Sequence, residues 1–573
     1  MVIRLWVYFL YLLLIAGCTG TIQQPADVIF YNGNIVTVDK DFSVAEAVAI
    51  ENGKFSAVGN DEDIFKLTSD STQKIDLKGR TVIPGIIENH AHPISASQSE
   101  LIQKIPDLQS MDELLSWIHQ EAEVKNDGEW IIHPKFFSTR LKELRQPTIE
   151  ELDLVAPDNP VFLNGSYGGM INTKAYEKSG FAQVDHPGIL RNEKSGKPTG
   201  FIRSSAFKLL AINNKNPLTE NERSEALRNM FALYNAVGVT SVCDGLGSPG
   251  SLKLYENLKD KGQLSVRVYQ NMYVPFDPHS PIDEMRETLK NFNYKTGDGD
   301  EWIKVGALKV ILDGGILTGT AFLREPWGST ANEVFKVTDP DYQGELNFSR
   351  EELINIILAA DEAGWKFTAH VTGGGGVDVL LSALEEVNKS RPIQEKRHSI
   401  IHGNFLIPEA IDKMATLGIY ADMQPAWFYK DTDFLYKVLG MDRLKSFHPY
   451  QSLFEAGVIV NGGSDHMVKL DCDASINPYN PFLSMWSVIT RKTERESLFY
   501  PDQAISRKQA LQMYTINNAY ASFEENIKGS IEVGKLADMV VLSDNILTCP
   551  VEDIKDIKSE ITVVDGEIVY SRN

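Results

Sequence analysis

The sequence predicts an α/β fold, a TIM-like (β/α)8 barrel with a small β-sandwich built from both ends of the chain. The middle of the 573-residue chain alternates short β-rich runs with helical stretches, as a parallel α/β fold requires. Both ends are instead rich in short β-runs separated by turn residues. The length exceeds what one compact core holds, so a barrel with a smaller satellite unit is expected.

Eight β-rich runs are expected to form the barrel strands. They occupy residues 81–90, 238–245, 266–272, 305–315, 366–371, 399–403, 419–424 and 458–465. Helical patterns separate several of them, for example at 351–364 and 377–390. We expect the barrel domain over residues 84–535, with a large insertion at about 94–232 after the first strand. The insertion has its own helical pattern at 111–125 and an apolar run at 159–165.

The sandwich is expected from residues 27–83 together with residues 536–573. Each end alone offers too few strands for a stable sheet, which favours one composite unit over two separate β appendages. A short polar linker, residues 18–26, precedes the first of these strands.

The first 17 residues have the features of a lipoprotein signal peptide. Arg4 precedes an apolar stretch of about a dozen residues, which is too short to span a bilayer comfortably. The segment ends Ile-Ala-Gly-Cys, which resembles a bacterial lipobox, so we expect lipidation of Cys18 and an exported, membrane-anchored protein. The alternative is a cleaved signal followed by an incidental cysteine.

The net charge and the cysteine content limit the classes of binding partner and of covalent cross-link that are expected. The net charge of −22, with no run of Lys or Arg, argues against nucleic acid as a partner and leaves the lipid anchor as the expected membrane contact. Cys243, Cys472 and Cys549 are far apart and odd in number, so no disulfide framework is indicated. Cys472 is a candidate ligand, but an ordinary semi-buried thiol is favoured because no Cys or His lies at metal-ligand spacing.

Chemically useful residues stand where the predicted strands end, which is where TIM barrels carry their active sites. The first strand ends in His90 and His92, which the strand period places on the same side. His370, His402 and Asp465 stand at the ends of the fifth, sixth and eighth strands. The fourth strand carries Lys309 and Asp313, which share parity and are expected to point the same way.

These motifs resemble the amidohydrolase superfamily, and within it the YtcJ-like group, amidohydrolase family 3. TVIPGIIENHAH is similar to the first-strand motif of that family and KLADMVVL to its C-terminal sandwich signature. APDNPVFLNGSYGGMINTKAYEKSG and GKPTGF resemble its insertion, and LKVILDGGILTGTA its lysine-bearing strand. The resemblance runs from about residue 27 to the C-terminus.

The resemblance implies a metal-dependent hydrolase that cleaves an amide-type C–N bond of a small molecule. The implied ligands of one or two divalent ions, commonly zinc, are His90, His92, Lys309, His370, His402 and Asp465, with Lys309 carboxylated on its side-chain nitrogen. Neutral imidazoles suit zinc, whereas a free ammonium beside divalent cations is disfavoured. Asp465 is the expected general base and acid, acting on metal-activated water.

Several alternatives stay open at this point. A deaminase or cyclic amidase would use the same residues, and a catalytically inactive, lipid-anchored binding protein would be expected to lack one of them. Lys309 could pair with Asp313 instead of a metal, and Asp465 could cap a following helix. The assembly state is also open, with a homodimer as one option.

The sequence departs from the family pattern at three places. Glu88-Asn89 replaces the usual Asp-Ser before the histidine pair, HVTGGGGVD follows the fifth strand, and SYGGMIN lacks the usual histidine of the insertion. The last two positions are expected to face the substrate, so its identity cannot be transferred from the family. Asp313, Gly373 and Gly374 are the candidate substrate-binding residues, with a mobile glycine loop as the alternative for the glycines.

Overall fold

The computed structural model describes residues 25–572, apart from residues 102–103, 193–194, 213–217 and 275–279. The expected signal peptide and Cys18 lie outside this range. Within the described ranges, no helix is both long enough and apolar enough to cross a membrane.

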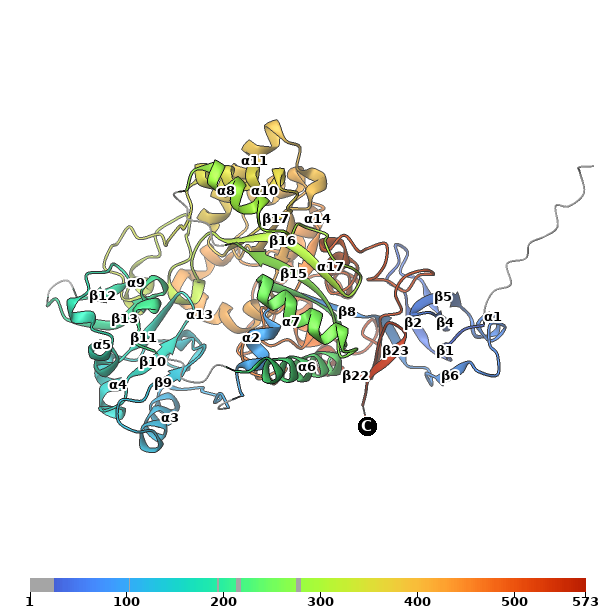
Figure 1. The fold of residues 1–573 in the computed structure, drawn as a ribbon, viewed down its shortest axis with the longest axis horizontal. Coiled ribbons are helices and arrows are strands. Elements are labelled where there is room, and N and C mark those ends of the chain that lie inside the picture. The colour runs from blue at the N-terminus through green and yellow to red at the C-terminus, as the bar shows by residue number, and fades with distance from the viewer. Residues whose placement is uncertain (1–24, 102–103, 193–194, 213–217, 275–279, 573) are drawn as a thin grey trace, which may run out of the picture.

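Eight parallel strands form the central sheet, in the order β20-β19-β18-β17-β16-β15-β14-β8, so each strand pairs with its neighbour in the chain (Figure 1). This confirms the predicted TIM-like barrel. The strands are β8 (Ile86–Ala91), β14 (Val239–Gly247), β15 (Arg267–Tyr273), β16 (Ile303–Ile311), β17 (Phe367–Val371), β18 (Ser399–His402), β19 (Tyr420–Met423) and β20 (Val460–Gly462).

The residues next to β8 and β20 close the barrel. The amide of Asp465 donates a hydrogen bond to the carbonyl of His90 at 2.7 Å. The buried carboxylate of Glu88 accepts backbone N–H groups from both sides of this seam, from His90 at 3.0 Å and from Ser464 at 2.8 Å. The first and last strands are therefore joined where their chemically active residues stand.

The predicted first strand, residues 81–90, is two strands in the structure. Residues Thr81–Pro84 form β7, which belongs to the sandwich, and β8 begins at Ile86. Proline cannot donate to a continued ladder, and the chain changes sheets at Gly85, whose amide donates to the Asp538 carbonyl at 2.9 Å. A Cβ at Gly85 would lie 2.2 Å from Oγ1 of Thr240, so the crossing needs glycine.

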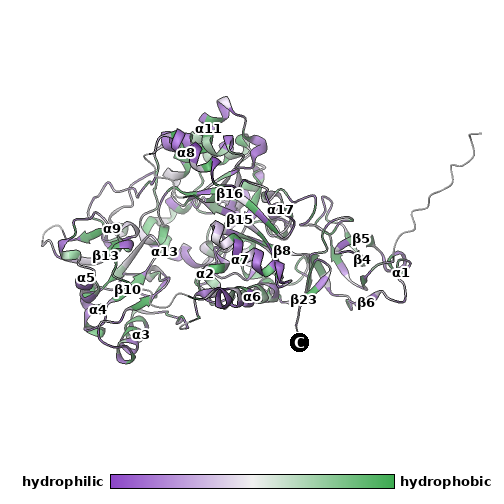
Figure 2. Cartoon of the chain, in the orientation of Figure 1, coloured by the Kyte–Doolittle hydropathy of each residue, from purple (hydrophilic) through white to green (hydrophobic). Residues whose placement is uncertain are grey.

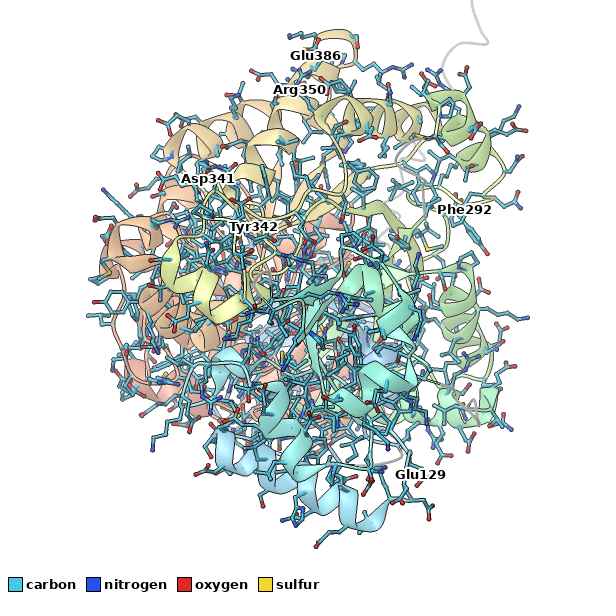
Figure 3. The ribbon with its side chains drawn as sticks, turned by 90° about the vertical axis from the view of Figure 1, so that its left-hand side faces the viewer. Glu129, Phe292, Asp341, Tyr342, Arg350 and Glu386 are labelled. Carbon is cyan, nitrogen blue, oxygen red and sulfur yellow. The ribbon has the colours of Figure 1, made fainter. Side chains whose placement is uncertain are left out.

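Helices cover the outside of the barrel, and in Figure 2 helices such as α8 and α11 carry both polar and apolar residues. The predicted helices at 351–364 and 377–390 are present as α10 and α11. The paired side chains of Arg350 and Glu386, 3.0 Å apart, join these two helices (Figure 3). The outer helices are α6 (Glu220–Ala236), α7 (Pro249–Asp260), α8 (Ile282–Lys290), α10 (Arg350–Glu362), α11 (Gly374–Ser390), α12 (Pro408–Leu417) and α14 (Tyr450–Glu455).

Both ends of the chain contribute to the smaller β-unit, which lies on the opposite side of the barrel from the insertion (Figure 1). Its four-stranded sheet has the order β5-β4-β1-β6, and its six-stranded sheet has the order β23-β22-β21-β7-β2-β3. The two sheets bury Phe30, Val82, Met539 and Val563 in a common core. The strands are β1 (Val28–Tyr31), β2 (Asn34–Val36), β3 (Val44–Ala45), β4 (Ala47–Glu51), β5 (Lys54–Gly59), β6 (Gln73–Asp76), β21 (Met539–Leu542), β22 (Ser559–Val564) and β23 (Glu567–Ser571).

The insertion forms its own five-stranded sheet, in the order β12-β13-β11-β10-β9. Its helix α3 (Met111–Val124) begins where the Ser110 side chain accepts the N–H of Glu113. The insertion is joined to the barrel loops by Arg203, which donates to the Tyr342 hydroxyl at 2.8 Å (Figure 3). Its strands are β9 (Ile131–His133), β10 (Val161–Asn164), β11 (Gly168–Ile171), β12 (Ile189–Arg191) and β13 (Pro198–Arg203).

Candidate metal centre and active site

The six residues predicted to bind metal all line one cavity of about 540 Å³ at the carboxyl ends of the barrel strands. Five of them are buried, and His92 is partly exposed. They come from five strands or the residues just after them: His90, His92, Lys309, His370, His402 and Asp465. The topology therefore brings together residues that are up to 375 positions apart in the chain.

His90, His92 and Asp465 form the tightest part of this group. The Oδ1 atom of Asp465 lies 3.1 Å from Nε2 of His92 and 3.7 Å from Nε2 of His90. One ligand atom from each residue falls within 4.8 Å of the others, a spacing that lets one metal ion reach all three. Asp465 does not cap a helix: the next helix, α15 (Pro481–Thr490), is capped by Asn480.

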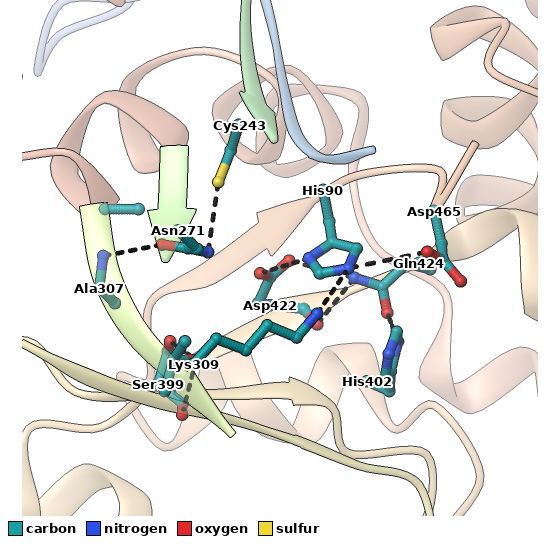
Figure 4. A network of polar contacts seen from close by, with 12 residues as sticks. His90, Cys243, Asn271, Ala307, Lys309, Ser399, His402, Asp422, Gln424 and Asp465 are labelled. Atoms are coloured by element: carbon teal, nitrogen blue, oxygen red, sulfur yellow. Dashed lines mark hydrogen bonds and ion pairs between the residues drawn. The ribbon is translucent and has the colours of Figure 1, made fainter. Parts of the chain in front are cut away.

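Lys309 extends from β16 to the same point. Its Nζ atom lies 3.4 Å from Nε2 of His90 (Figure 4). Burial lowers the pKa of Lys309, although the nearby carboxylates of Asp465 and Asp422 act in the opposite direction. Its amine therefore faces the histidines and not Asp313.

His370 and His402 complete the ring of imidazoles, with ring centroids 4.6 Å apart. Nε2 of His370 lies 3.1 Å from the Gly314 carbonyl, so this nitrogen carries the proton and Nδ1 keeps a lone pair toward the cavity. Nδ1 of His402 lies 2.6 Å from Oε1 of Gln424, which leaves Nε2 free (Figure 4). Trp427 stacks on His402 with centroids 4.4 Å apart and fixes the plane of that ring.

Burial keeps these imidazoles neutral, which is the form that binds metal. It lowers the pKa of His370 to about 3 and moves the pKa values of His90 and His402 well below their usual range. For Asp465, burial raises the pKa, but the hydrogen bond to His92 and nearby positive charge, including that of Lys135, outweigh it, so the net pKa is lowered. The cavity therefore presents neutral nitrogen donors beside one ionised carboxylate.

Asp465 and His402 both hold strained backbones. Their φ angles are 57° and 74°, in the left-handed region that residues other than glycine seldom adopt. Such conformations persist where the surrounding structure enforces them, and they concentrate at functional sites. The strain supports the assignment of these two residues to the site.

The residues that contact the Nδ1 atoms of His90 and His402 were not predicted from the sequence. Oδ2 of Asp422 lies 3.6 Å from Nδ1 of His90, and burial raises the pKa of Asp422 to about 7. Gln424, two residues further along, orients His402. A carboxylate or amide on the far ring nitrogen fixes the orientation of a ligating histidine. The available signal was the polar pair at the end of the run IYADMQ, which closes the seventh predicted strand.

Asp313, Gly373 and Gly374 do not line the cavity. Because β16 ends at Ile311, the alternation that placed Asp313 beside Lys309 stops before it. The Asp313 carboxylate instead accepts the amides of Thr372 and Gly373, both at 2.8 Å. The glycine run begins α11 and is buried, so it is not an open loop. A Cβ at Gly373 would lie 2.1 Å from the carbonyl oxygen of Phe322, so glycine is needed for the close approach of two chain segments.

The insertion supplies a wall of the cavity, as expected for its SYGGMIN segment, whereas the contribution of Lys135 and Arg140 was not predicted. Tyr167, from the segment where the usual histidine is missing, places its hydroxyl 3.3 Å from Nδ1 of His370. Lys135 and Arg140 line the cavity from the residues after β9. Arg140 is held by Asp431 of α13 (Pro425–Leu444), with contacts of 2.7 and 3.0 Å. Burial lowers the pKa of Lys135 to about 8.

The family model described as "Amidohydrolase family" matches residues 73–570 of this chain. The chain belongs to the amidohydrolase family. It is 27% identical to the N-substituted formamide deformylase of Arthrobacter pascens, over 96% of this chain and 99% of that protein. It is 25% identical to the Bacillus subtilis protein described as amidohydrolase YtcJ, over 95% of this chain and 99% of that one.

The fold is similar to that of an uncharacterized metal-dependent hydrolase from Pyrococcus horikoshii OT3, with a TM-score of 0.67 and 22% identity. The alignment covers 92% of this chain and 99% of the solved one. As an amidohydrolase with a cluster of metal-ligand residues in its barrel mouth, this chain is a metal-dependent hydrolase that acts on C–N bonds. The predicted YtcJ-like resemblance and the predicted enzyme class are confirmed.

Proposed function

We propose that this amidohydrolase cleaves the open-chain amide of a small N-substituted formamide or related N-acyl compound, releasing a carboxylic acid and an amine. The observation that carries the proposal is the convergence of the ionised Asp465 carboxylate and the donor nitrogens of four histidines on one cavity. The formamide deformylase relative, similar over nearly its whole length, supports this substrate class.

The donor set fits zinc, in one or two ions. Neutral imidazoles with one carboxylate are ligands that zinc accepts, and the contacts to Gly314 and Gln424 leave His370 and His402 each with one unprotonated nitrogen in the cavity. When bound, the ion lowers the pKa of a coordinated water from 15.7 toward about 7 and polarises the scissile carbonyl. Nδ1 of His90 is buried without a hydrogen-bond partner, and a carboxylate oxygen of Asp422 lies 3.6 Å from it. A carboxylate at this position orients a histidine whose other nitrogen binds metal.

We propose that Lys309 carries a carbamate. A neutral amine combines with carbon dioxide to give a carbamate and one proton, and burial favours the neutral amine at this position. A carbamate replaces a buried cation by an anionic oxygen ligand at the centre of the site. Carbon-13 NMR of protein equilibrated with labelled bicarbonate should show a carbamate resonance that is absent from Lys309→Met.

The proton route is assigned to Asp465. Its carboxylate takes a proton from the attacking water and later gives it to the nitrogen of the departing amine, so one water is consumed for each acid and amine formed. The hydrogen bond to His92 holds Oδ1 in the cavity for both transfers. Tyr167 lines the same cavity beside Nδ1 of His370, where its hydroxyl can donate a hydrogen bond to the substrate carbonyl oxygen.

Turnover of three sets of substrates tests the proposal: N-formyl amines, longer N-acyl amines and cyclic amides. Release of formate or another acid together with a free primary amine is the expected result with the first two sets. Release of ammonia from an aminated ring, or opening of a cyclic amide only, would favour the deaminase or cyclic amidase instead. Tight ligand binding by a metal-free protein without turnover would favour the inactive binding protein.

We also propose that the protein is exported and held at a membrane by a lipid on Cys18, on the basis of the short apolar segment and the Ile-Ala-Gly-Cys motif. Cys18→Ser should leave an unprocessed precursor or release the protein from the membrane fraction. Cys472→Ser serves as the matched control, since that free cysteine lies in the barrel domain. Identical fractionation of Cys18→Ser and the wild type would contradict lipidation.

A further inference from the structure

Lys135 is a half-buried cation in the wall of the metal-site cavity, two residues after β9. Its Nζ atom contacts Oγ of Ser166 and lies 6.0 Å from the centre of the Phe137 ring. In the part of the chain that the structure describes, no acidic side chain forms an ion pair with it. A hydroxyl and a distant ring face are weak partners for an ammonium removed from bulk water.

The neighbouring cation in the same wall is fully paired. Arg140 forms two contacts with Asp431, at 2.7 and 3.0 Å, and one with Oδ1 of Asn477 at 3.1 Å. The one carboxylate among the described residues that line this cavity is Asp465, which is engaged by His92. Lys135 therefore lines the substrate cavity without an ion pair to any described acidic side chain, although the charge of Asp465 in the same cavity acts on it from a distance.

Lys135 also borders a second cavity of about 660 Å³. Ser166, Tyr167 and Ile311 line both cavities together with Lys135, so these four residues form the partition between them. The acidic side chain of Glu345 in the second cavity is already paired with Arg203. Asp313, the other acidic side chain of that wall, accepts the amides of Thr372 and Gly373. A substrate group that reaches Lys135 at the partition therefore meets no acidic side chain of the described wall that lacks a partner.

We propose that Lys135 binds a carboxylate on the nitrogen-side substituent of the substrate, so that the enzyme prefers N-formyl or N-acyl amino acids over neutral amides of the same size. The inference rests on the proposed function, because it places the scissile bond at the metal centre and the carboxylate at the partition. Lysine supplies a compact positive charge on a flexible stem, which suits a carboxylate held by one charged hydrogen bond. Hydrogen bonds to charged groups contribute about 10- to 100-fold in binding.

The probes are three N-formyl amino acids, formylglycine, formyl-leucine and formyl-phenylalanine, each with its primary amide as the uncharged match. Binding to the metal-loaded protein is measured by calorimetry at pH 7, and kcat/KM is measured separately. In the wild type at least one acid should bind about 10-fold or more tightly than its amide. Lys135→Met, which keeps the length of the side chain, should reduce this ratio to within about twofold of unity while binding of the amides stays within about threefold.

Lys142→Met is the matched control, because Lys142 lies on the same insertion but is exposed and outside both cavities. It should keep the wild-type ratio. A preference that survives Lys135→Met would show that the metal centre itself holds the carboxylate and would overturn the proposal, as would a wild type without any preference. A Lys135-dependent binding preference without hydrolysis of any probe would refute the proposed function and leave this inference standing.

Discussion

Replacing Asp465 by Asn tests the chemical mechanism with little disturbance of the structure. The φ angle of 57° at this position is tolerated by Asn about as well as by Asp, whereas alanine would be strained there. The backbone contacts of residue 465 do not depend on its side chain: its amide donates to His90 at 2.7 Å and its carbonyl accepts from Asn477 at 2.8 Å. The amide oxygen of Asn can still accept from His92, so the fold should be kept.

The loss expected in Asp465→Asn is the contribution of a general base. That contribution is about 10²–10⁴-fold in kcat. It corresponds to about 3–5 kcal/mol of activation free energy. The amide has no basic oxygen to take a proton from the attacking water, while His90, His92, His370 and His402 still present their donor nitrogens to metal. Metal content should therefore remain near the wild-type level while kcat falls.

The assay measures kcat and metal content on the same preparation, with circular dichroism as the check of folding. Asp471→Asn is the matched control: Asp471 is exposed and caps the amides of Asp473 and Ala474, contacts that Asn can also make. It should behave as the wild type. An Asp465→Asn enzyme with near-wild-type kcat would refute Asp465 as the proton carrier, and simultaneous loss of metal would reduce its role to that of a ligand.

Three further predictions follow from the same contacts. Gln424→Leu removes the 2.6 Å partner of His402, so metal affinity should fall about 10- to 100-fold in a titration with zinc, while Gln424→Glu should retain more of it. Burial lowers the pKa of His133 to about 4, so between pH 6.5 and 4 the unfolded chain binds a proton at this residue before the folded chain does. The contribution of His133 to the free energy of unfolding should therefore be complete above pH 6.5 and fall by up to about 3 kcal/mol toward pH 4. Thermal melts of His133→Leu should show a weaker pH dependence over this interval. Removal of metal with a chelator should abolish turnover and lower the melting temperature, and zinc should restore both, since ligands that bind only the folded state stabilise it; an active chelated enzyme would contradict the proposed centre.

The barrel, and the clustering of the six predicted ligand residues at its mouth, could be predicted from the sequence because both follow a local rule. Each barrel strand is a short apolar run, and parallel strands end at one face, so a residue such as His370 or His402 is placed by its position alone. The prediction for Asp313 used the same alternation but extended it past Ile311, where the strand stops. Side chains alternate between the two faces of a sheet only within a strand, so the alternation does not predict where a side chain in the following turn points.

Glycine runs are ambiguous for a different physical reason. A missing Cβ permits the close approach of any group, and the sequence does not say which group approaches. At Gly374 the neighbour is the guanidinium of Arg324, whose NH1 would lie 2.2 Å from a Cβ, and at Gly373 it is the backbone of Phe322. Both neighbours are about 50 residues away in the chain, so only the folded structure distinguishes protein packing from substrate binding.

Lys135 and Arg140 of the insertion could not be predicted because their position in the cavity wall depends on tertiary contacts that have no local sequence pattern. Arg140 reaches the barrel through its pairing with Asp431, a buried carboxylate on α13, and through a hydrogen bond to Asn477. The same helix carries Trp427, which stacks on His402. The helix α13 therefore contacts both the wall that contains Lys135 and Arg140 and the imidazole of His402. Leaving Asp431 unpaired in the interior would lower the free energy of unfolding by several kcal/mol, so this ion pair should persist. It thereby fixes the distance between the wall that contains Lys135, where the substrate is proposed to be selected, and the proposed metal centre, where it is cleaved.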